Sequence, residues 1–189
     1  NVRANYARGF RAPTVSELAA NGVHEGSIQY ELGNSALKAE NSRQLDLGLD
    51  YTTHWVNVQA ALFTNRIDHY VYLSKLAGVV TDGYATYRYQ QGDARLVGGE
   101  VSIDLHPVNA FHFENALSYV EGRQLHRHDE GKYLPMIPAT RWNMDVRYNF
   151  RDFGGGHLRR SYVAFGMEYH FRKDHYYGVS DTETATPDY

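Results

Sequence analysis

The chain has 189 residues, a net charge of −3 at neutral pH and no cysteine. The lack of cysteine excludes disulfides and thiolate metal sites, and the small, unclustered charge argues against nucleic acid as a partner. No run of about 18 apolar residues occurs, so the sequence contains no transmembrane helix. Tyrosine, phenylalanine and glycine are nevertheless abundant, with 16, 8 and 17 residues.

Apolar and polar residues alternate over about ten positions in several stretches, and this alternation predicts seven strands. In 141–150, every even position is apolar and every odd position is charged or an amide. Successive side chains of a strand point to opposite faces, so each predicted strand has an apolar face and a polar face. The predicted strands cover 1–8, 43–53, 55–68, 95–106, 109–121, 139–150 and 158–172.

The connections between these strands alternate between short turns and long loops. Short turns are predicted at 52–54, 106–108 and 151–157, and long loops at 9–42, 69–94, 122–138 and 173–188. Outer-membrane barrels have short turns on the periplasmic side and long loops outside. Aromatic residues flank the short turns, where an interfacial girdle is expected, namely Tyr51, Trp55, Phe111, Tyr148 and Phe150. The pattern therefore predicts an all-β fold, about seven strands of an antiparallel transmembrane β-barrel, which would be an open sheet if alone.

A soluble antiparallel sandwich is the alternative, because its strands also alternate between apolar and polar residues. Sandwich strands usually have about 5–6 residues, whereas these have about ten to fourteen. A sandwich also has no reason to alternate long and short connections. Both features favour the membrane barrel.

Three motifs sharpen the interpretation. The first motif, Phe10-Arg11-Ala12-Pro13, follows the first predicted strand. The second precedes the second predicted strand; it contains Asn34 and Leu37 and ends in Lys38-Ala39-Glu40. The third, Gly98-Gly99-Glu100, lies within the predicted strand 95–106. These residues resemble the TonB-dependent outer-membrane receptors, which carry a Phe-Arg-Ala-Pro box and an Asn-Pro-x-Leu-Lys-Pro-Glu box. The second segment lacks both prolines of that box, and with them the fixed φ angle that proline provides.

The resemblance implies that residues 1–189 are part of a 22-stranded barrel domain, with the plug domain and the last strands outside this stretch. It implies a receptor in the bacterial outer membrane, in contact with lipid, that imports a ferric siderophore or a similar large ligand. A periplasmic partner would act on the plug and supply energy from the inner-membrane proton gradient. Haem or cobalamin uptake on the same scaffold is an alternative, and a passive porin-type channel is another.

The candidate ligand-binding residues lie in the first two long loops. The resemblance implies that His24 is a haem ligand if the chain belongs to the haem-transporting branch. Aromatic rings and a guanidinium would suit an anionic aromatic chelate, and the residues of this kind are Tyr30, Tyr70, Tyr72, Tyr87, Arg88 and Tyr89. Packing of the loop on itself, or an aromatic girdle at the outer boundary, would also explain most of these tyrosines.

No other chemistry is indicated by the sequence. It contains no catalytic motif, so we expect neither an enzyme nor a cofactor. His126, His128, Asp129 and Glu130 are metal-ligand types, but a polar loop also produces such a segment, and no metal site is predicted. The charged residues of the polar faces would be costly in lipid and are expected to face a wet lumen.

Overall fold

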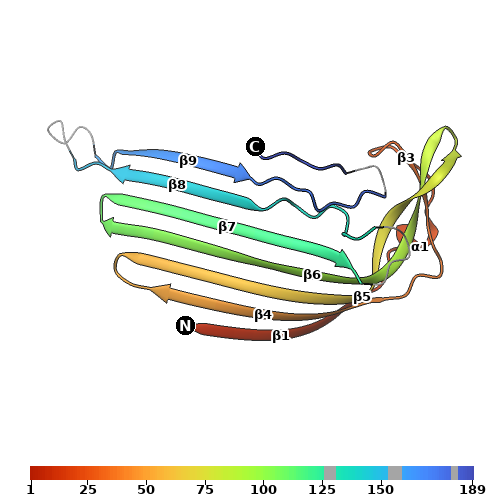
Figure 1. The fold of residues 1–189 in the computed structure, drawn as a ribbon, viewed down its shortest axis with the longest axis horizontal. Coiled ribbons are helices and arrows are strands. Elements are labelled where there is room, and N and C mark those ends of the chain that lie inside the picture. The colour runs from red at the N-terminus through yellow and green to blue at the C-terminus, as the bar shows by residue number, and fades with distance from the viewer. Residues whose placement is uncertain (126–130, 153–158, 180–182) are drawn as a thin grey trace.

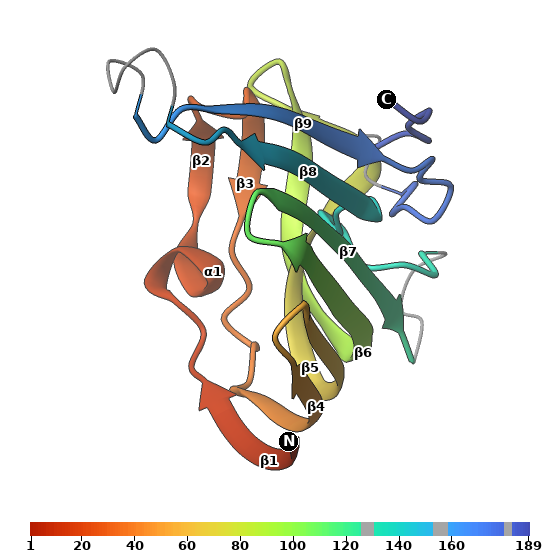
Figure 2. The same cartoon turned by 90° about the vertical axis from the view of Figure 1, so that its left-hand side faces the viewer.

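The chain forms one sheet that is open at both edges and whose seven main strands are antiparallel (Figure 1). The computed structural model describes residues 1–125, 131–152, 159–179 and 183–189. The elements are β1 (Val2–Arg11), α1 (Val15–Ala19), β2 (Asn21–His24), β3 (Gln29–Leu32), β4 (Glu40–Thr52), β5 (Val56–Thr81), β6 (Tyr84–Val108), β7 (Phe111–Gln124), β8 (Arg141–Asn149) and β9 (Tyr162–His170). Seven of the strands follow one another in the order β1-β4-β5-β6-β7-β8-β9, and the sheet curves along this direction (Figure 2).

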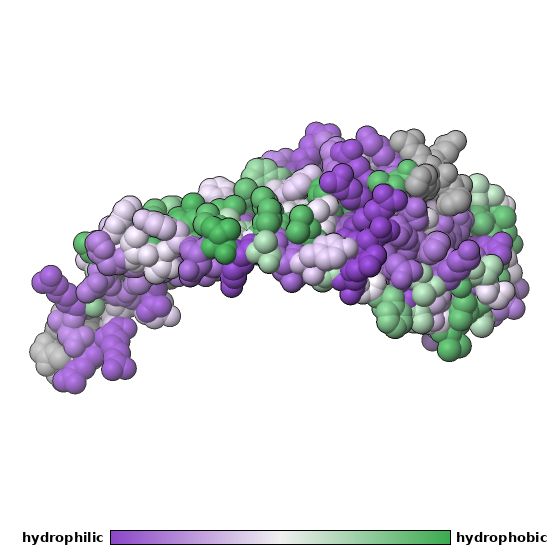
Figure 3. Space-filling model, turned by 90° about the horizontal axis from the view of Figure 1, so that it is seen from below, coloured by the Kyte–Doolittle hydropathy of each residue, from purple (hydrophilic) through white to green (hydrophobic). Residues whose placement is uncertain are grey.

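Strand register gathers the apolar residues on one side of the sheet, which we call the apolar face. Leu47 of β4 pairs with Ala4 of β1 and with Leu62 of β5, and the same alternation continues to β9. The opposite, polar face is hollowed, because recesses of about 720 and 240 Å³ are lined mainly by its side chains. Figure 3 shows apolar residues over the middle of the arched sheet and hydrophilic residues on either side of them.

No second protein layer covers the apolar face within the described residues. Val163 and Phe165 are 56% and 62% exposed, and Trp142, Met144 and Val146 are all at least partly exposed. A water-soluble sandwich would bury these side chains. The structure therefore contradicts the sandwich alternative and confirms the antiparallel barrel segment that the sequence predicts.

An amide in the middle of the apolar face is hydrogen-bonded. Asn115 of β7 lies between Phe113 and Leu117 on this face, where the alternation in the sequence is weakest. Trp142 Nε1 on the neighbouring strand β8 donates to Asn115 Oδ1 at 3.2 Å. The bond pairs the two polar groups, which would otherwise be costly in hydrocarbon.

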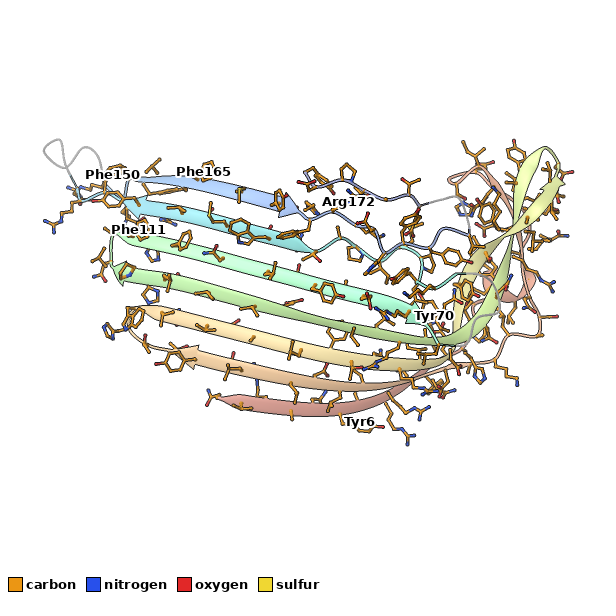
Figure 4. The ribbon with its side chains drawn as sticks, viewed as in Figure 1. Tyr6, Tyr70, Phe111, Phe150, Phe165 and Arg172 are labelled. Atoms are coloured by element: carbon orange, nitrogen blue, oxygen red, sulfur yellow. The ribbon has the colours of Figure 1, made fainter. Side chains whose placement is uncertain are left out.

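Aromatic side chains mark both ends of the apolar face. Phe111 and Phe150 lie at the short-turn end of the sheet, and Tyr6 lies toward the long-loop end (Figure 4). Tyr148 and Phe150 contact edge to face with ring centroids 5.1 Å apart. Aromatic girdles of this kind are typical of the two interfaces of a membrane barrel.

The long-loop end differs from the sequence prediction. Residues 69–94, predicted as a loop, continue β5 and β6 as a projecting hairpin, which closes through Asp82 and Gly83 with φ of 52° and 83°. Two positive φ angles at an Asp-Gly pair are typical of a type I′ hairpin turn. The first predicted loop contains α1, β2 and β3. No helix in the described part of the chain is long and apolar enough to cross a membrane.

The two glycines of the Gly98-Gly99-Glu100 motif leave space for side chains of the neighbouring strand β5. A Cβ atom at Gly98 would lie 2.5 Å from the ring of Phe63 and 2.6 Å from the carbonyl oxygen of Tyr119. A Cβ atom at Gly99 would lie 2.6 Å from Leu62 on the opposite face. The two glycines therefore let β5 side chains lie directly on the β6 backbone.

We expect Gly98→Ala to destabilise the full-length protein by about 1–3 kcal/mol, because the backbone oxygen of Tyr119 cannot move away freely. Gly48→Ala is the matched control, since the nearest atom to its Cβ is 3.7 Å away on the same polar face. The midpoint of the heat-induced gel-mobility shift measures the effect. Equal midpoints for the two variants would contradict this packing role.

Candidate functional site

An arginine clamp fixes the segment that joins β1 to β4. Arg11 donates to both carboxylate oxygens of Glu40, at 2.8 and 2.7 Å, and to both oxygens of Glu17, at 3.0 and 2.9 Å. Glu40 Oε1 also accepts the backbone N–H of Val71 on β5 at 2.7 Å. Arg11 belongs to the Phe-Arg-Ala-Pro motif, and Glu40 is the last residue of the motif that precedes β4. The clamp therefore joins these two motifs to each other and to β5.

Helix α1 is held beside this clamp by a capping box. The hydroxyl of Thr14 accepts the N–H of Glu17 at 3.2 Å, and the Glu17 carboxylate accepts the N–H of Thr14 at 2.7 Å. Partial burial acts to raise the pKa of Glu17, but the hydrogen bonds from Arg11 and Thr14 outweigh it and hold that pKa below its usual value. Glu17 is therefore an anion that both caps the helix and binds the arginine.

Hydrogen bonds hold the second motif where its two prolines are missing. Asn34 Nδ2 donates to the carbonyl of Tyr89 at 3.2 Å. The side chain of Gln91 accepts the N–H of Lys38 at 2.8 Å and donates to the carbonyl of the same residue at 2.5 Å. The segment is thus tied to β6 by side-chain contacts rather than by fixed φ angles.

The small hairpin of β2 and β3 adds to the projecting β5–β6 hairpin. Tyr30 and Glu31 of β3 pair in parallel with Thr86 and Tyr87 of β6. Between α1, β2 and β6 lies an open recess of about 470 Å³. Its lining residues are Ser16, Ala20, Asn21, Gly22, Val23, His24, Glu31 and Tyr89, and we call it the outer recess.

Two of the predicted ligand residues, His24 and Tyr89, line the outer recess together. His24 is exposed, and its Nδ1 lies 3.1 Å from the hydroxyl of Ser27. Tyr89 donates its hydroxyl to Glu31 Oε2 at 2.9 Å. Partial burial and this bond to Glu31 raise the pKa of Tyr89 to about 12, so at neutral pH the phenol is a neutral hydrogen-bond donor.

The other predicted ligand residues lie outside the recess. Tyr72 and Tyr87 are 4% and 7% exposed. Tyr72 packs edge to face on Tyr177, with ring centroids 5.9 Å apart, and Tyr70 stacks on Tyr72. Tyr30 donates its hydroxyl to Asn21 at 2.9 Å, and Arg88 is exposed on β6. The buried rings thus form a small core that supports the projecting hairpin.

The polar face below the outer recess is acidic. The backbone pairing places Asp104, Glu114 and Asp145 side by side on three neighbouring strands. With Glu168 they line the larger of the two recesses on this face. Arg3 and Arg141 line the smaller recess, and Arg3 forms an ion pair of 2.8 Å with Asp50. The wall is thus built to meet water or a polar protein surface.

Sequence reasoning missed Glu31 of the outer recess and the bridging role of Gln91. Within the described residues, no group of three or more metal-ligating side chains could hold a metal ion. The histidine segment at 126–130 lies outside the described residues.

A family model for the β-barrel of TonB-dependent receptors matches residues 1–189. The chain belongs to the TonB-dependent receptor family. The barrels of this family lie in the bacterial outer membrane, and its members are transport receptors rather than enzymes. The resemblance seen in the sequence motifs is thereby confirmed.

Solved structures of TonB-dependent receptors share the fold. The copper transporter OprC aligns over 100% of this chain and 27% of its own length, with 18% identity and a TM-score of 0.78. The siderophore receptor PirA from Acinetobacter baumannii aligns over 100% and 31%, with 17% identity and a TM-score of 0.66. The ferric-catecholate import receptor Fiu from E. coli K12 aligns over 100% and 25%, with 20% identity and a TM-score of 0.63. The chain therefore spans about a quarter to a third of the length of these structures.

We expect Arg11→Lys to loosen the segment 12–39, because lysine keeps the charge but cannot form the two-pronged bonds to Glu17 and Glu40. Amide hydrogen exchange in this segment of the full-length receptor should accelerate about tenfold. Arg172→Lys is the control, since its pair with Asp174 joins residues only two positions apart. Unchanged exchange in the Arg11 variant would show that the clamp does not hold the loop.

Proposed function

We propose that this barrel segment belongs to an active-transport receptor that binds and imports a ferric siderophore or a chemically similar metal chelate. The outer recess carries this proposal. It lies at the long-loop end, held by the arginine clamp and the projecting hairpin, and it presents an imidazole, a carboxylate and a phenol to the outside. Two of the structurally similar proteins named above are described as siderophore or ferric-catecholate receptors, and the third as a copper transporter.

The chemistry of the recess suits a chelate better than a bare metal ion. The phenol of Tyr89 is neutral at neutral pH and donates its hydrogen to Glu31, so its ring can stack on an aromatic ligand and its oxygen can accept a hydrogen bond. A bare cation would need several deprotonated ligands close together. In this mechanism the wall and loops collect the ligand. A plug domain, moved by a periplasmic partner that uses the inner-membrane proton gradient, would then admit the ligand.

Energy dependence separates this function from passive diffusion. Cells that carry the full-length receptor as their only uptake route should accumulate radioactive iron from ferric enterobactin, used as the catecholate probe. A protonophore should abolish the accumulation, because active import needs the proton gradient. Uptake that survives the protonophore would favour the porin-type alternative. Uptake of haem alone, abolished by His24→Ala, would favour the haem branch.

We expect Tyr89→Ala to weaken binding of ferric enterobactin to the purified full-length receptor about tenfold, since it removes a ring and a hydroxyl from the outer recess. Tyr162→Ala is the matched control, because Tyr162 is 57% exposed at the short-turn end of the sheet. Quenching of intrinsic fluorescence measures both affinities. Equal affinities would remove Tyr89 from the binding site.

A further inference from the structure

An arginine occupies the same level on each of five neighbouring strands. Arg8 of β1 pairs with Arg43 of β4, which pairs with Arg66 of β5, which pairs with Arg95 of β6, which pairs with Arg123 of β7. All five side chains are exposed. We call these residues the arginine row.

The arginine row lies on the apolar face. Along each strand, residues two positions apart share a face, and Arg8, Arg43 and Arg95 follow the alternation of Tyr6, Leu45 and Val97. Arg66 and Arg123 are in register with them. The row therefore points away from the lumen and from the hollow of the polar face. A ligand that enters through the barrel would not meet it.

Carboxylates neutralise only part of this charge. Asp68 lies between Arg43 and Arg66, Glu121 pairs with Arg123, and Asp93 is 4.0 Å from Arg66. Within the part of the chain that the structure describes, five guanidinium groups thus face three carboxylates. Arg8 and Arg95 have no carboxylate within 4.0 Å among the described residues.

Like charges directly opposite one another on neighbouring strands destabilise a sheet. At about 4.8 Å between strands, the five arginines span only about 19 Å. A ligand with several negative charges would remove this repulsion. The geometry of the row thus favours an anionic surface over a single small anion.

The level of the row matches the outer boundary of the hydrocarbon. Arg43 lies 8 residues from Tyr51 at the short-turn end of β4, and Arg123 lies 12 residues from Phe111 at the same end of β7. At about 3.4 Å per residue and the usual strand tilt, these separations correspond to heights of about 21 and 31 Å. The apolar band of a membrane barrel is about 25 Å tall.

The β7 end of the row continues into further cations and aromatic rings. The Arg123 guanidinium lies 5.8 Å from the centre of the Tyr133 ring, and the Lys132 ammonium lies 5.1 Å from it. The His175 ring stacks on the same ring with centroids 4.6 Å apart, and its Nδ1 lies 3.0 Å from Glu121 Oε2. Amphipathic aromatic residues and cations are typical of a head-group region.

We propose that the arginine row binds the phosphate groups of anionic lipids in the outer leaflet, whose acyl chains pack on the apolar face below. The guanidinium group matches phosphate geometry with two parallel hydrogen bonds, and a row of five can contact several phosphates at once. Phosphate oxygens supply the charge that the three carboxylates do not. The proposal does not depend on the transported ligand.

Native mass spectrometry of the full-length receptor in neutral detergent tests this proposal, with diphosphoryl lipid A as the probe. The double variant Arg8→Gln/Arg95→Gln removes the two arginines that lack carboxylate partners, and we expect about 30-fold weaker binding. Arg3→Gln is the matched control on the polar face and should bind the probe as the wild type does. Inorganic phosphate should not displace the probe, because the acyl chains contribute to its binding.

Wild-type affinity in the double variant would overturn the proposal, as would an equal loss in Arg3→Gln. Equal binding of phosphatidylcholine, which has no net charge, would also overturn it. The glutamine variant is compared only if it assembles, as judged by heat-induced gel mobility. If it does not assemble, the variant Arg8→Lys/Arg95→Lys tests the proposal in its place. Lysine keeps the charge and loses the two-pronged geometry, so several-fold weaker binding supports the proposal and unchanged binding contradicts it.

Discussion

Each strand of this sheet separates two unlike environments, and the rest of the structure depends on that separation. Hydrocarbon supplies no hydrogen bonds, so backbone groups must pair between strands, and pairing fixes which side chains face outward. A slip of one residue in β8 would carry Arg141, Asp145 and Arg147 to the lipid side. At about 2–4 kcal/mol for an arginine at the midplane, such a slip is strongly disfavoured. The alternation itself therefore sets the register.

The outer part of the molecule is built on this wall but is stabilised differently. Above the membrane, β5 and β6 continue as a hairpin that packs a small aromatic core around Tyr72 and Tyr177. Polar contacts then attach the first loop to the hairpin, chiefly through Arg11, Glu40 and Gln91. The arrangement of the outer recess thus depends on polar contacts between segments far apart in sequence.

The wall could be predicted from the sequence because a two-residue period is local information. All seven predicted strands occur, and the predicted open antiparallel sheet is the observed fold. The hairpin at 69–94 could not be predicted in the same way. A positive φ of 61° at His69 and a register shift between Ile67 and Tyr70 break the period where the strand continues.

The side-chain groupings depend on tertiary contacts that no sequence window contains. Tyr72 and Tyr87 look like ligand residues in the sequence, yet both are buried, while Glu31 of the outer recess has no local signal. The arginine row is the clearest case, because the intervals between its residues follow no period. Only the pairing of five strands brings these arginines to one level.

The two faces of the wall carry opposite charge, and the surroundings of each face explain why. Asp104, Glu114 and Asp145 are in register on the polar face, where water in a lumen can hydrate them and reduce their repulsion. On the proposal made above, the arginine row has hydrocarbon on one side and polar head groups on the other. The charge that Asp68, Asp93 and Glu121 leave unbalanced would then be balanced from the head-group side. A long side chain at this level can extend toward the interface while its methylene groups stay in contact with lipid. Acidic side chains are shorter, and at this level Asp68 and Glu121 are each paired with an arginine of the row.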